Sequence, residues 1–371
     1  MSVKPPTRSV SGPEQPIRVM VVDDSAVIRG MIARWVGEAG PFEVVCTASN
    51  GRMAVDMAER HKPEIVLLDI EMPEVDGLAA LPLLLKAHPA SKVIVISTLT
   101  KRNAQVSLKC LSLGAVDYLA KPESARAADA AALFRRDLLE KLCALSAAKA
   151  RQTPAAPATG VMSAPAAPAP SLRPGHVRPK CLLIGSSTGG PRAVERVLQD
   201  LGPTLTRIPV LIVQHMPPMF TAVFAEHLQT LLSLPCREAK DGDAIVAGTV
   251  LVAPGGRHMG VNAGSGNPAV RLNDDPPENF CRPAVDVLFR EAASVFGASA
   301  VAVVLTGMGS DGTVGARHLV QAGATVMAQD EASSIVWGMP GSVVRAGLAH
   351  DVLPLDTIGQ SLKSLIAGTS R

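Results

Sequence analysis

The stretch that decides the fold of the second half of the chain is Cys181-Leu182-Leu183-Ile184-Gly185-Ser186-Ser187-Thr188-Gly189-Gly190-Pro191. A short apolar run ends in a cluster of glycine and serine, and an amphipathic segment follows over residues 192–201. This order predicts a buried strand, a tight turn and a helix. A serine in the turn would stand beside the amides of a helix N-terminus. Residues 185–189 also fit the G-x-S-x-G pattern of a nucleophile elbow, but such turns are common, so a purely structural turn stays open.

The composition indicates a globular protein of two domains. A chain of 371 residues can form two domains of ordinary size, each burying its own core. Hydrophobic residues make up 47% and charged residues 19%, which excludes a disordered chain. The net charge of +3 is too small to indicate nucleic acid or a membrane surface, and 3% aromatic residues offer few stacking platforms for a single strand.

The sequence predicts a cytoplasmic protein with reduced cysteines. Residues 1–17 lack the apolar core of a signal peptide, and no apolar run approaches the length that spans a bilayer. The six cysteines are scattered, without a C-x-x-C pair, and this spacing is not typical of a disulfide framework or a zinc site.

Short apolar segments alternate with helical ones in the first half of the chain. Strands are expected at 18–22, from 44 onward, and at 65–68, 93–96 and 115–119. The alternation predicts an α/β fold with a doubly wound, five-stranded parallel sheet. Ligands of such sheets bind at the carboxyl ends of the strands.

Polar residues stand at those strand ends, namely Asp23, Asp24, Asp69, Ser97 and Lys121. Three clustered carboxylates would repel one another unless a divalent cation lay between them, and oxygen ligands with access to water suit Mg²⁺. Each residue also has an ordinary explanation, because aspartate caps helices and lysine is common in loops. That all five reach strand ends by chance is much less plausible.

Residues 17–140 resemble the receiver domain of two-component response regulators. The motifs that carry the resemblance are Asp23-Asp24, the segment Asp-Ile-Glu-Met-Pro-Glu-Val-Asp-Gly at 69–77, Ser97, Tyr118 and Lys121-Pro122. The resemblance implies that Asp69 accepts a phosphoryl group from a histidine kinase. It also implies that Asp24, Asp69 and the Glu71 carbonyl hold Mg²⁺ beside Asp23. Ser97 and Lys121 would contact the phosphoryl group, and Tyr118 would change position with it.

A linker is expected between the two domains. Residues 129–150 have the apolar spacing of one helix, whereas 151–179 are rich in proline and alanine and poor in large apolar side chains. Proline prevents the helix from continuing, so an extended, semi-stiff linker follows. The predicted domains are therefore 17–140 and 180–368.

The second domain again alternates strands and helices. Strands are expected at 181–184, 208–213, from 250, at 300–305 and at 324–328, which predicts a largely parallel sheet. Three strand ends deliver Ser187, His215 and Asp311, the set that acyl transfer needs: a nucleophile, a general base and a carboxylate that orients the base. The order differs from that of α/β-hydrolases.

Each of these residues has an alternative. Ser186 is a rival nucleophile, His258 is a rival base, and Asp311 could cap the helix expected from about Thr313. Glycines around Met308 leave its loop free to present amides as an oxyanion hole. Residues 185–190 could instead cradle a phosphate, but neither common phosphate-binding glycine motif is present.

Residues 180–368 resemble the catalytic domain of bacterial chemotaxis protein-glutamate methylesterases. The matching segments are 185–190 (GSSTGG), 214–217 (QHMP), 253–259 (APGGRHM), 282–289 (RPAVDVLF), 306–312 (TGMGSDG) and 337–340 (WGMP). The resemblance implies Ser187 as nucleophile, His215 as general base and Asp311 as its orienting partner. Met308 would supply an oxyanion-hole amide near Thr188, and the ester chemistry would need no cofactor.

The resemblance implies a phosphorylation-activated hydrolase. It would remove methyl groups from glutamyl esters of chemoreceptors, release methanol and also deamidate receptor glutamines. In the family the unphosphorylated receiver covers the active site. The implied partners are chemoreceptors and a histidine kinase, with no nucleic acid and no membrane insertion. A phospho-controlled binding module without chemistry is the alternative, and the presence of all three candidate catalytic residues argues against it.

Overall fold

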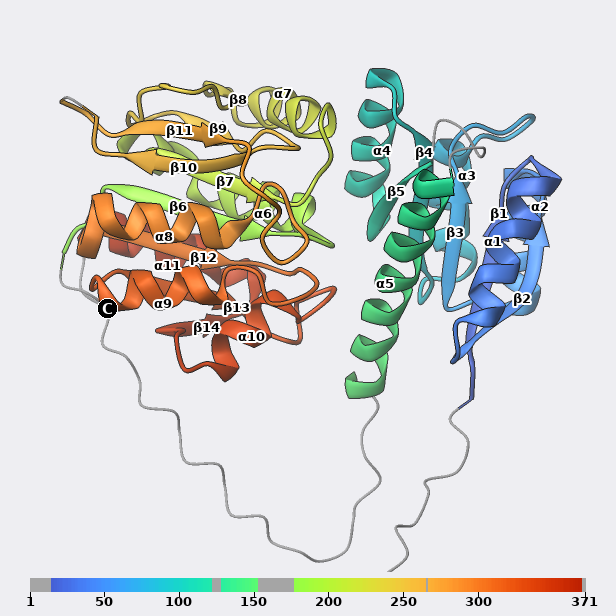
Figure 1. The fold of residues 1–371 in the computed structure, drawn as a ribbon. Coiled ribbons are helices and arrows are strands. Elements are labelled where there is room, and N and C mark those ends of the chain that lie inside the picture. Colours follow the sequence, from blue (N-terminus) through green and yellow to red (C-terminus); the bar gives the residue numbers. More distant parts are fainter. Residues whose placement is uncertain (1–14, 122–127, 153–176, 265, 369–371) are drawn as a thin grey trace, which may run out of the picture. The chain divides into compact units, whose positions relative to one another are not determined.

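The computed structural model describes residues 15–121, 128–152, 177–264 and 266–368. It contains two separate main sheets, one in each half of the chain, and a small hairpin (Figure 1). Most of the expected linker at 151–179 lies outside the described residues. Among the described residues, no helix is both long and apolar enough to cross a membrane.

The first sheet has five strands in the order β2-β1-β3-β4-β5. The strands are β1 (Ile17–Val22), β2 (Phe42–Ala48), β3 (Ile65–Asp69), β4 (Lys92–Thr98) and β5 (Asp117–Lys121). The pairs β1–β2, β1–β3 and β3–β4 are parallel, and this strand order is that of a doubly wound fold, as predicted. The fifth strand begins two residues later than expected. The reason is that Gly114 and Ala115 still donate hydrogen bonds to the last turn of the preceding helix.

Helices connect these strands: α1 (Ala26–Glu38), α2 (Gly51–His61), α3 (Gly77–Ala87), α4 (Lys101–Leu113) and α5 (Ala128–Gln152). A polar side chain accepts a hydrogen bond from the first turn of each of the first four helices. These caps are Ser25, Asn50, Asp76 and Thr100. They satisfy amides that would otherwise lack a partner, so each helix starts at a fixed residue. The helix predicted over 129–150 corresponds to α5.

The second sheet has seven strands in the order β14-β13-β12-β6-β7-β9-β8. They are β6 (Cys181–Ser186), β7 (Val210–Gln214), β8 (Cys236–Glu238), β9 (Val250–Val252), β12 (Ala300–Val304), β13 (Thr325–Gln329) and β14 (Asp351–Leu353). All neighbouring pairs are parallel, which confirms the predicted sheet. The strand that starts at Val250 ends at Val252. His258 belongs instead to β10 (His258–Asn262), which pairs antiparallel with β11 (Ala269–Asn273).

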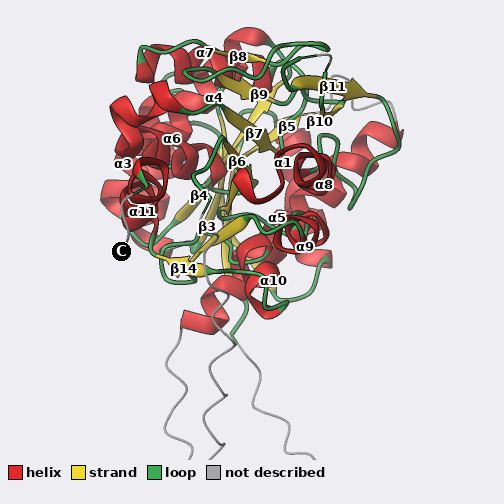
Figure 2. Cartoon of the chain, turned by 90° about the vertical axis from the view of Figure 1, so that its left-hand side faces the viewer, coloured by secondary structure: helices red, strands yellow, loops and turns green. Residues whose placement is uncertain are grey.

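Helices cover both faces of this sheet (Figure 2). On one face lie α6 (Gly190–Leu201), α7 (Phe220–Leu232) and α11 (Leu355–Ala367), with α6 packed against both of the others. The other face carries α8 (Val285–Phe296), α9 (Thr313–Gln321) and α10 (Met339–Arg345), and α8 packs against α9 and β10. Two short 3₁₀ helices, Gly202–Arg207 and Gly297–Ser299, follow α6 and α8.

The central strands β6 and β12 are buried along their whole length, so the core forms where the helices pack on them.

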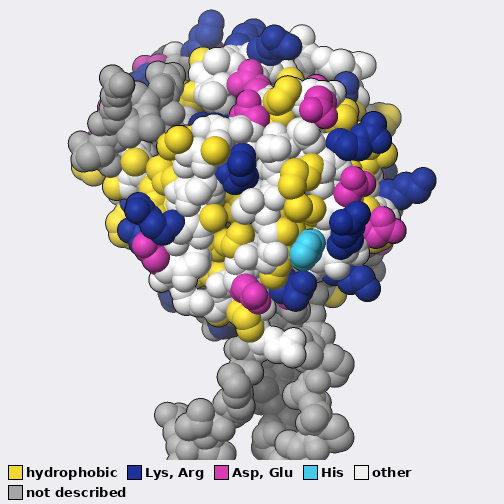
Figure 3. All heavy atoms as spheres, turned by 90° about the vertical axis from the view of Figure 1, so that its right-hand side faces the viewer, with side chains coloured by type: hydrophobic (Ala, Val, Ile, Leu, Met, Phe, Trp, Pro, Cys, Tyr) yellow, Lys and Arg dark blue, Asp and Glu magenta, His cyan; other side chains and the backbone are white. Residues whose placement is uncertain are grey.

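On the surface drawn in Figure 3, basic and acidic side chains are interspersed among apolar ones. This mixture agrees with the small net charge of +3.

Substitution of two phenylalanines, one buried and one exposed, tests this description of the core. Phe289 of α8 is fully buried, whereas Phe280 is 87% exposed. Phe289→Ala should lower the free energy of unfolding by about 3–5 kcal/mol, because it removes apolar contacts and leaves a cavity. Phe280→Ala, the matched control, should change the same quantity by no more than about 0.5 kcal/mol. Urea unfolding of the full chain, followed by circular dichroism, measures both, and equal effects would contradict the core described.

Candidate active site

The three residues proposed for acyl transfer follow neighbouring strands. Ser187 comes directly after β6, His215 directly after β7, and Asp311 lies in the loop that leaves β12. Because β12, β6 and β7 are adjacent and parallel, their carboxyl ends meet at one edge of the sheet. The main chain joins two of these segments there, since the amide of His215 donates a 3.1 Å hydrogen bond to the carbonyl of Ser186.

Asp311 connects the histidine to helix α8. Its Oδ2 atom lies 2.8 Å from Nε2 of His215 and accepts a 2.6 Å hydrogen bond from the amide of Val285. Its Oδ1 atom accepts 3.0 Å bonds from the amides of Asp286 and Gly312. Burial opposes ionisation of Asp311, but the bond and charge of His215, with these amides, outweigh it and hold the pKa of the carboxyl below its ordinary value.

The alternative role for Asp311 as the cap of α9 is wrong. The N-cap of α9 is Gly312, and no side chain caps that helix. The carboxylate of Asp311 instead accepts from the first amides of α8, where the helix dipole favours a negative charge.

His215 is half-buried and both of its ring nitrogens have neighbours. Nε2 faces Asp311, and Nδ1 lies 3.5 Å from the sulfur of Cys281. Burial of the ring lowers the pKa of His215, but the hydrogen bonds to Asp311 and Cys281 stabilise the charged ring more strongly, so its pKa is raised.

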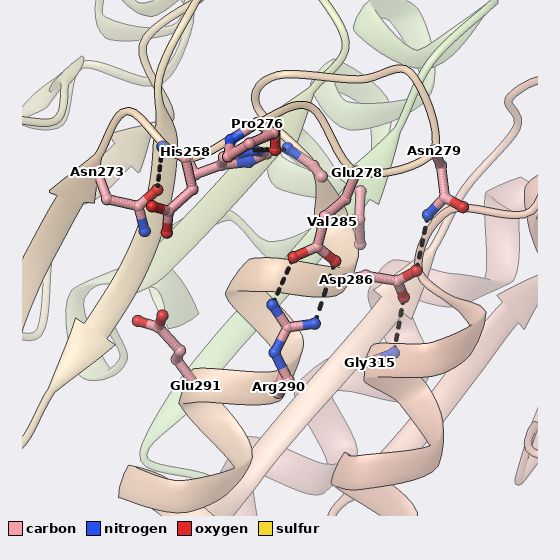
Figure 4. Close-up of polar contacts among 12 residues, drawn as sticks. His258, Asn273, Pro276, Glu278, Asn279, Val285, Asp286, Arg290, Glu291 and Gly315 are labelled. Atoms are coloured by element: carbon pink, nitrogen blue, oxygen red, sulfur yellow. Dashed lines mark hydrogen bonds and ion pairs between the residues drawn. The ribbon is translucent and has the colours of Figure 1, made fainter.

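The two rival residues have structural hydrogen bonds. Ser186 is fully buried, and its hydroxyl donates a 2.7 Å bond to Oε1 of Gln214. His258 is also fully buried, with Nε2 lying 3.1 Å from the carbonyl of Pro276 and Nδ1 accepting from the amide of Ala284. Figure 4 shows His258 beside Pro276. Ser187, in contrast, is half-buried, and its main chain is held by bonds to Thr306 and Gln214.

The loop around Met308 lies next to Ser187. The amide of Gly307 donates to the carbonyl of Val336, and the Gly307 carbonyl accepts from Met339. Met308 follows as a half-buried residue. Thr188 is buried, and its carbonyl accepts a 3.0 Å bond from the hydroxyl of Thr306.

A carboxylate cluster lies at the edge of the first sheet. Ligand atoms of Asp23, Asp24 and Asp69 all lie within 4.8 Å of one another, with Asp23 and Asp69 buried and Asp24 exposed. Oδ1 of Asp23 also accepts a 2.9 Å bond from the amide of Ser25. Three close carboxylates, one of them open to water, form a donor set that fits Mg²⁺. Glu71 is exposed in the loop that follows β3.

The remaining receiver candidates lie on β4 and β5. The hydroxyl of Ser97 is buried, 2.9 Å from that of Ser107 on α4. Tyr118 is buried in β5, and burial, followed by the charges of Asp117 and Asp137, raises the pKa of its phenol well above the ordinary value. Lys121 is the last residue of β5.

Comparison with known proteins gives two family matches. Residues 182–362 match the CheB methylesterase model, and residues 19–132 match the response regulator receiver domain model. A protein-glutamate methylesterase/protein-glutamine glutaminase of Rhodopseudomonas palustris strain BisB5 is 49% identical, and the match covers 97% of each chain. The chain belongs to the CheB methylesterase family.

Two further comparisons cover nearly the whole chain and its second half. A protein of the same name from Azospirillum brasilense is 45% identical over 96% of this chain and 94% of its own. The solved catalytic domain of CheB methylesterase from Thermotoga maritima is 41% identical, covers 51% of this chain and all of that domain, and has a TM-score of 0.49. The two family models and the names of the similar full-length proteins show that the chain is a carboxylic-ester hydrolase with a response-regulator receiver domain.

The methylesterase domain contains a polar network that the sequence motifs did not reveal (Figure 4). The side-chain nitrogen Nδ2 of Asn279 donates to the carboxylates of Asp286, at 2.9 Å, and Asp311, at 3.3 Å. Asp286 also accepts a bond from the main-chain amide of Gly315. Burial and the negative charge of Asp311 raise the pKa of Asp286 to about 6. Asp286 stands in the RPAVD segment, but only the fold shows that it lies beside Asp311.

Gly307 provides a test of the packing around Ser187. A Cβ at Gly307 would lie 2.4 Å from the sulfur of Met339 and 2.9 Å from Cβ of Ser187. Gly307→Ala should therefore cost about 1–3 kcal/mol of stability and, by displacing Ser187, slow ester hydrolysis about 10²-fold.

Gly30→Ala is the control, because a Cβ there meets no atom within 4 Å and helix α1 favours alanine. Thermal unfolding and initial rates of ester hydrolysis measure both variants. Wild-type rates in Gly307→Ala would show that the domain accommodates a methyl group against Ser187.

Proposed function

We propose that the methylesterase domain hydrolyses γ-glutamyl methyl esters on chemoreceptors through Ser187, His215 and Asp311, yielding methanol and glutamate. The observation that carries this proposal is the 2.8 Å contact between His215 and Asp311 at the sheet edge where Ser187 follows β6. The resemblance to methylesterases and the name of the similar proteins support the substrate.

In the proposed reaction, the hydroxyl oxygen of Ser187 attacks the ester carbonyl. Its proton passes to Nδ1 of His215, because Nε2 is held by Asp311. Asp311 stabilises the imidazolium that forms, and an amide of the Met308 loop, near Thr188, stabilises the oxyanion. The imidazolium returns the proton to the departing methoxide, which leaves as methanol.

Water then completes the cycle. It attacks the acyl-enzyme, gives a proton to His215, and the serine leaves with that proton while the glutamate carboxylate is released. The same steps on a glutamine side chain would expel ammonia instead of methanol, so deamidation needs no further residue. This chemistry requires no cofactor.

We further propose that phosphorylation of Asp69 by a histidine kinase controls the hydrolase. Asp23, Asp24, Asp69 and the carbonyl of Glu71 would hold Mg²⁺, which when bound offsets the negative charge that gathers during phosphoryl transfer. Ser97 and Lys121 would contact the phosphoryl group, and Tyr118 would move with it. Phosphorylation would shift the population away from a state in which the receiver covers the Ser187 site. The protein would act in the cytoplasm, where receptor helices and kinase are accessible.

The first test concerns the nucleophile. Ser187→Ala should reduce methanol release from methylated receptor about 10⁶-fold, because it removes the hydroxyl that forms the acyl-enzyme. The fold should persist, since the half-buried hydroxyl contributes little to packing. Methanol release from methyl-labelled receptor gives the rate, and circular dichroism checks the fold.

Ser186→Ala is the matched control. It removes only the hydrogen bond to Gln214, which should cost about 0.5–1.5 kcal/mol of stability and leave most of the activity. Reversed effects would make Ser186 the nucleophile. Full activity in both variants would support a different mechanism, and wild-type protein without activity would support the binding-module alternative.

The second test concerns control. Asp69→Asn should keep the basal esterase rate and lose its stimulation by an acyl phosphate with Mg²⁺, because an amide cannot accept the phosphoryl group. Chelation of Mg²⁺ should abolish stimulation of the wild type in the same way. Asp76→Asn is the control: Asp76 caps α3, and asparagine caps helices equally well. Stimulation that survives in Asp69→Asn would exclude Asp69 as the phosphoacceptor.

A further inference from the structure

Cys281 lies beside the candidate base although 66 positions separate them in the sequence. Its sulfur is 3.5 Å from Nδ1 of His215, and the residue is half-buried. The segment that carries it is anchored. Cys281 and Glu278 exchange two main-chain hydrogen bonds, of 2.8 and 3.2 Å, and Glu278 pairs with Arg290 of α8 at 2.6 Å (Figure 4). The cysteine is therefore held in place from α8.

The hydrogen bonds of Asp311 fix which nitrogen of His215 carries a proton. The carboxylate already accepts from three main-chain amides, so it acts as an acceptor toward Nε2 as well. When the ring is neutral, Nε2 therefore carries its hydrogen, and the lone pair of Nδ1 lies on the side of Cys281.

A nitrogen lone pair next to a thiol is a ligand pair for zinc. Bond lengths of about 2.3 Å to sulfur and 2.0–2.1 Å to nitrogen, at a tetrahedral angle, place the two ligand atoms about 3.6 Å apart. The observed 3.5 Å therefore needs no rearrangement. A carboxylate behind the ligating imidazole is the usual outer partner of zinc-bound histidine, and Asp311 has this position. Ligand atoms of His215, Cys281 and Asp311 all lie within 4.8 Å of one another.

We propose that Cys281 and His215 form an inhibitory site for Zn²⁺ or a similar thiophilic divalent ion. The thiol loses its proton to solvent as sulfur binds the metal. Nδ1 of His215 is the second ligand, and a charged ring releases its Nδ1 proton to solvent in the same step, while water fills the other positions. With only two protein ligands, binding is weaker than in a closed structural site. Inhibition rests on the proposed function, because the metal occupies the nitrogen that would take the proton of Ser187. Metal binding itself does not depend on the proposed function.

The experiment uses the full-length protein, with Co²⁺ as a spectroscopic substitute for Zn²⁺ and a non-chelating reductant present. Wild type should develop a near-ultraviolet thiolate-to-cobalt charge-transfer band that Zn²⁺ displaces. Cys281→Ala should lose this band, whereas Cys143→Ala, which alters an exposed cysteine on α5, should keep it. No band in the wild type, or an equal band in Cys281→Ala, overturns the site and leaves the 3.5 Å contact as a hydrogen bond only.

A second measurement separates the metal site from the hydrolase. Zn²⁺ should slow ester hydrolysis by the wild type, and a chelator should restore the rate. With the rates of each protein expressed relative to its own metal-free rate, the zinc concentration for half-inhibition should be at least tenfold higher in Cys281→Ala than in the wild type. Ser187→Ala should keep the cobalt band. A band in wild-type protein that shows no esterase activity would retire the proposed function and keep the metal site. Equal inhibition of the wild type and Cys281→Ala would overturn the inhibitory role of Cys281.

Discussion

The candidate site depends on one buried carboxylate. Asp311 leaves the sheet after β12, but its oxygens accept from the first amides of α8 and from His215, which follows β7. Three segments distant in the sequence are thereby fixed to one another. A buried charge is tolerated there because five donors surround it: three amides, the ring of His215 and the side chain of Asn279. The same bonds set the tautomer of His215, so they determine which nitrogen is available for chemistry or for a metal.

Close main-chain approach provides the second constraint. Gly190 and Gly307 both pack closely at the turn that carries Ser187. A Cβ at Gly190 would lie 2.8 Å from Cβ of Ser186, and one at Gly307 would lie 2.9 Å from Cβ of Ser187. The side chain of Gln214 bonds to both serines, accepting from the hydroxyl of Ser186 and donating to the carbonyl of Ser187. The serine turn is thus held by its main chain, and among the described residues the hydroxyl of Ser187 makes no hydrogen bond.

In both sheets the candidate site lies at the carboxyl ends of the strands, but the chemistry of the two sites differs. In the receiver domain the carboxyl ends of the strands gather carboxylates, which suits a hard cation with oxygen ligands. In the methylesterase domain they gather a hydroxyl, an imidazole and a carboxylate, which suits proton transfer. The thiol of Cys281 adds a soft ligand to the second set, so the two domains would respond to different metal ions.

The sequence by itself determined the strand-and-helix alternation, the two parallel sheets and the strand ends at which Ser187, His215 and Asp311 stand, because apolar runs and their polar ends are local patterns. It missed β8 (Cys-Arg-Glu), β11 (Ala-Val-Arg-Leu-Asn) and β14 (Asp-Val-Leu), because none of them is a continuous apolar run. It could not distinguish Ser186 from Ser187 or His258 from His215 by their surroundings. Only the tertiary structure decided that Asp311 is held by α8 and that Cys281 lies against His215, because these contacts arise where loops from separate strands meet, and no local pattern encodes them.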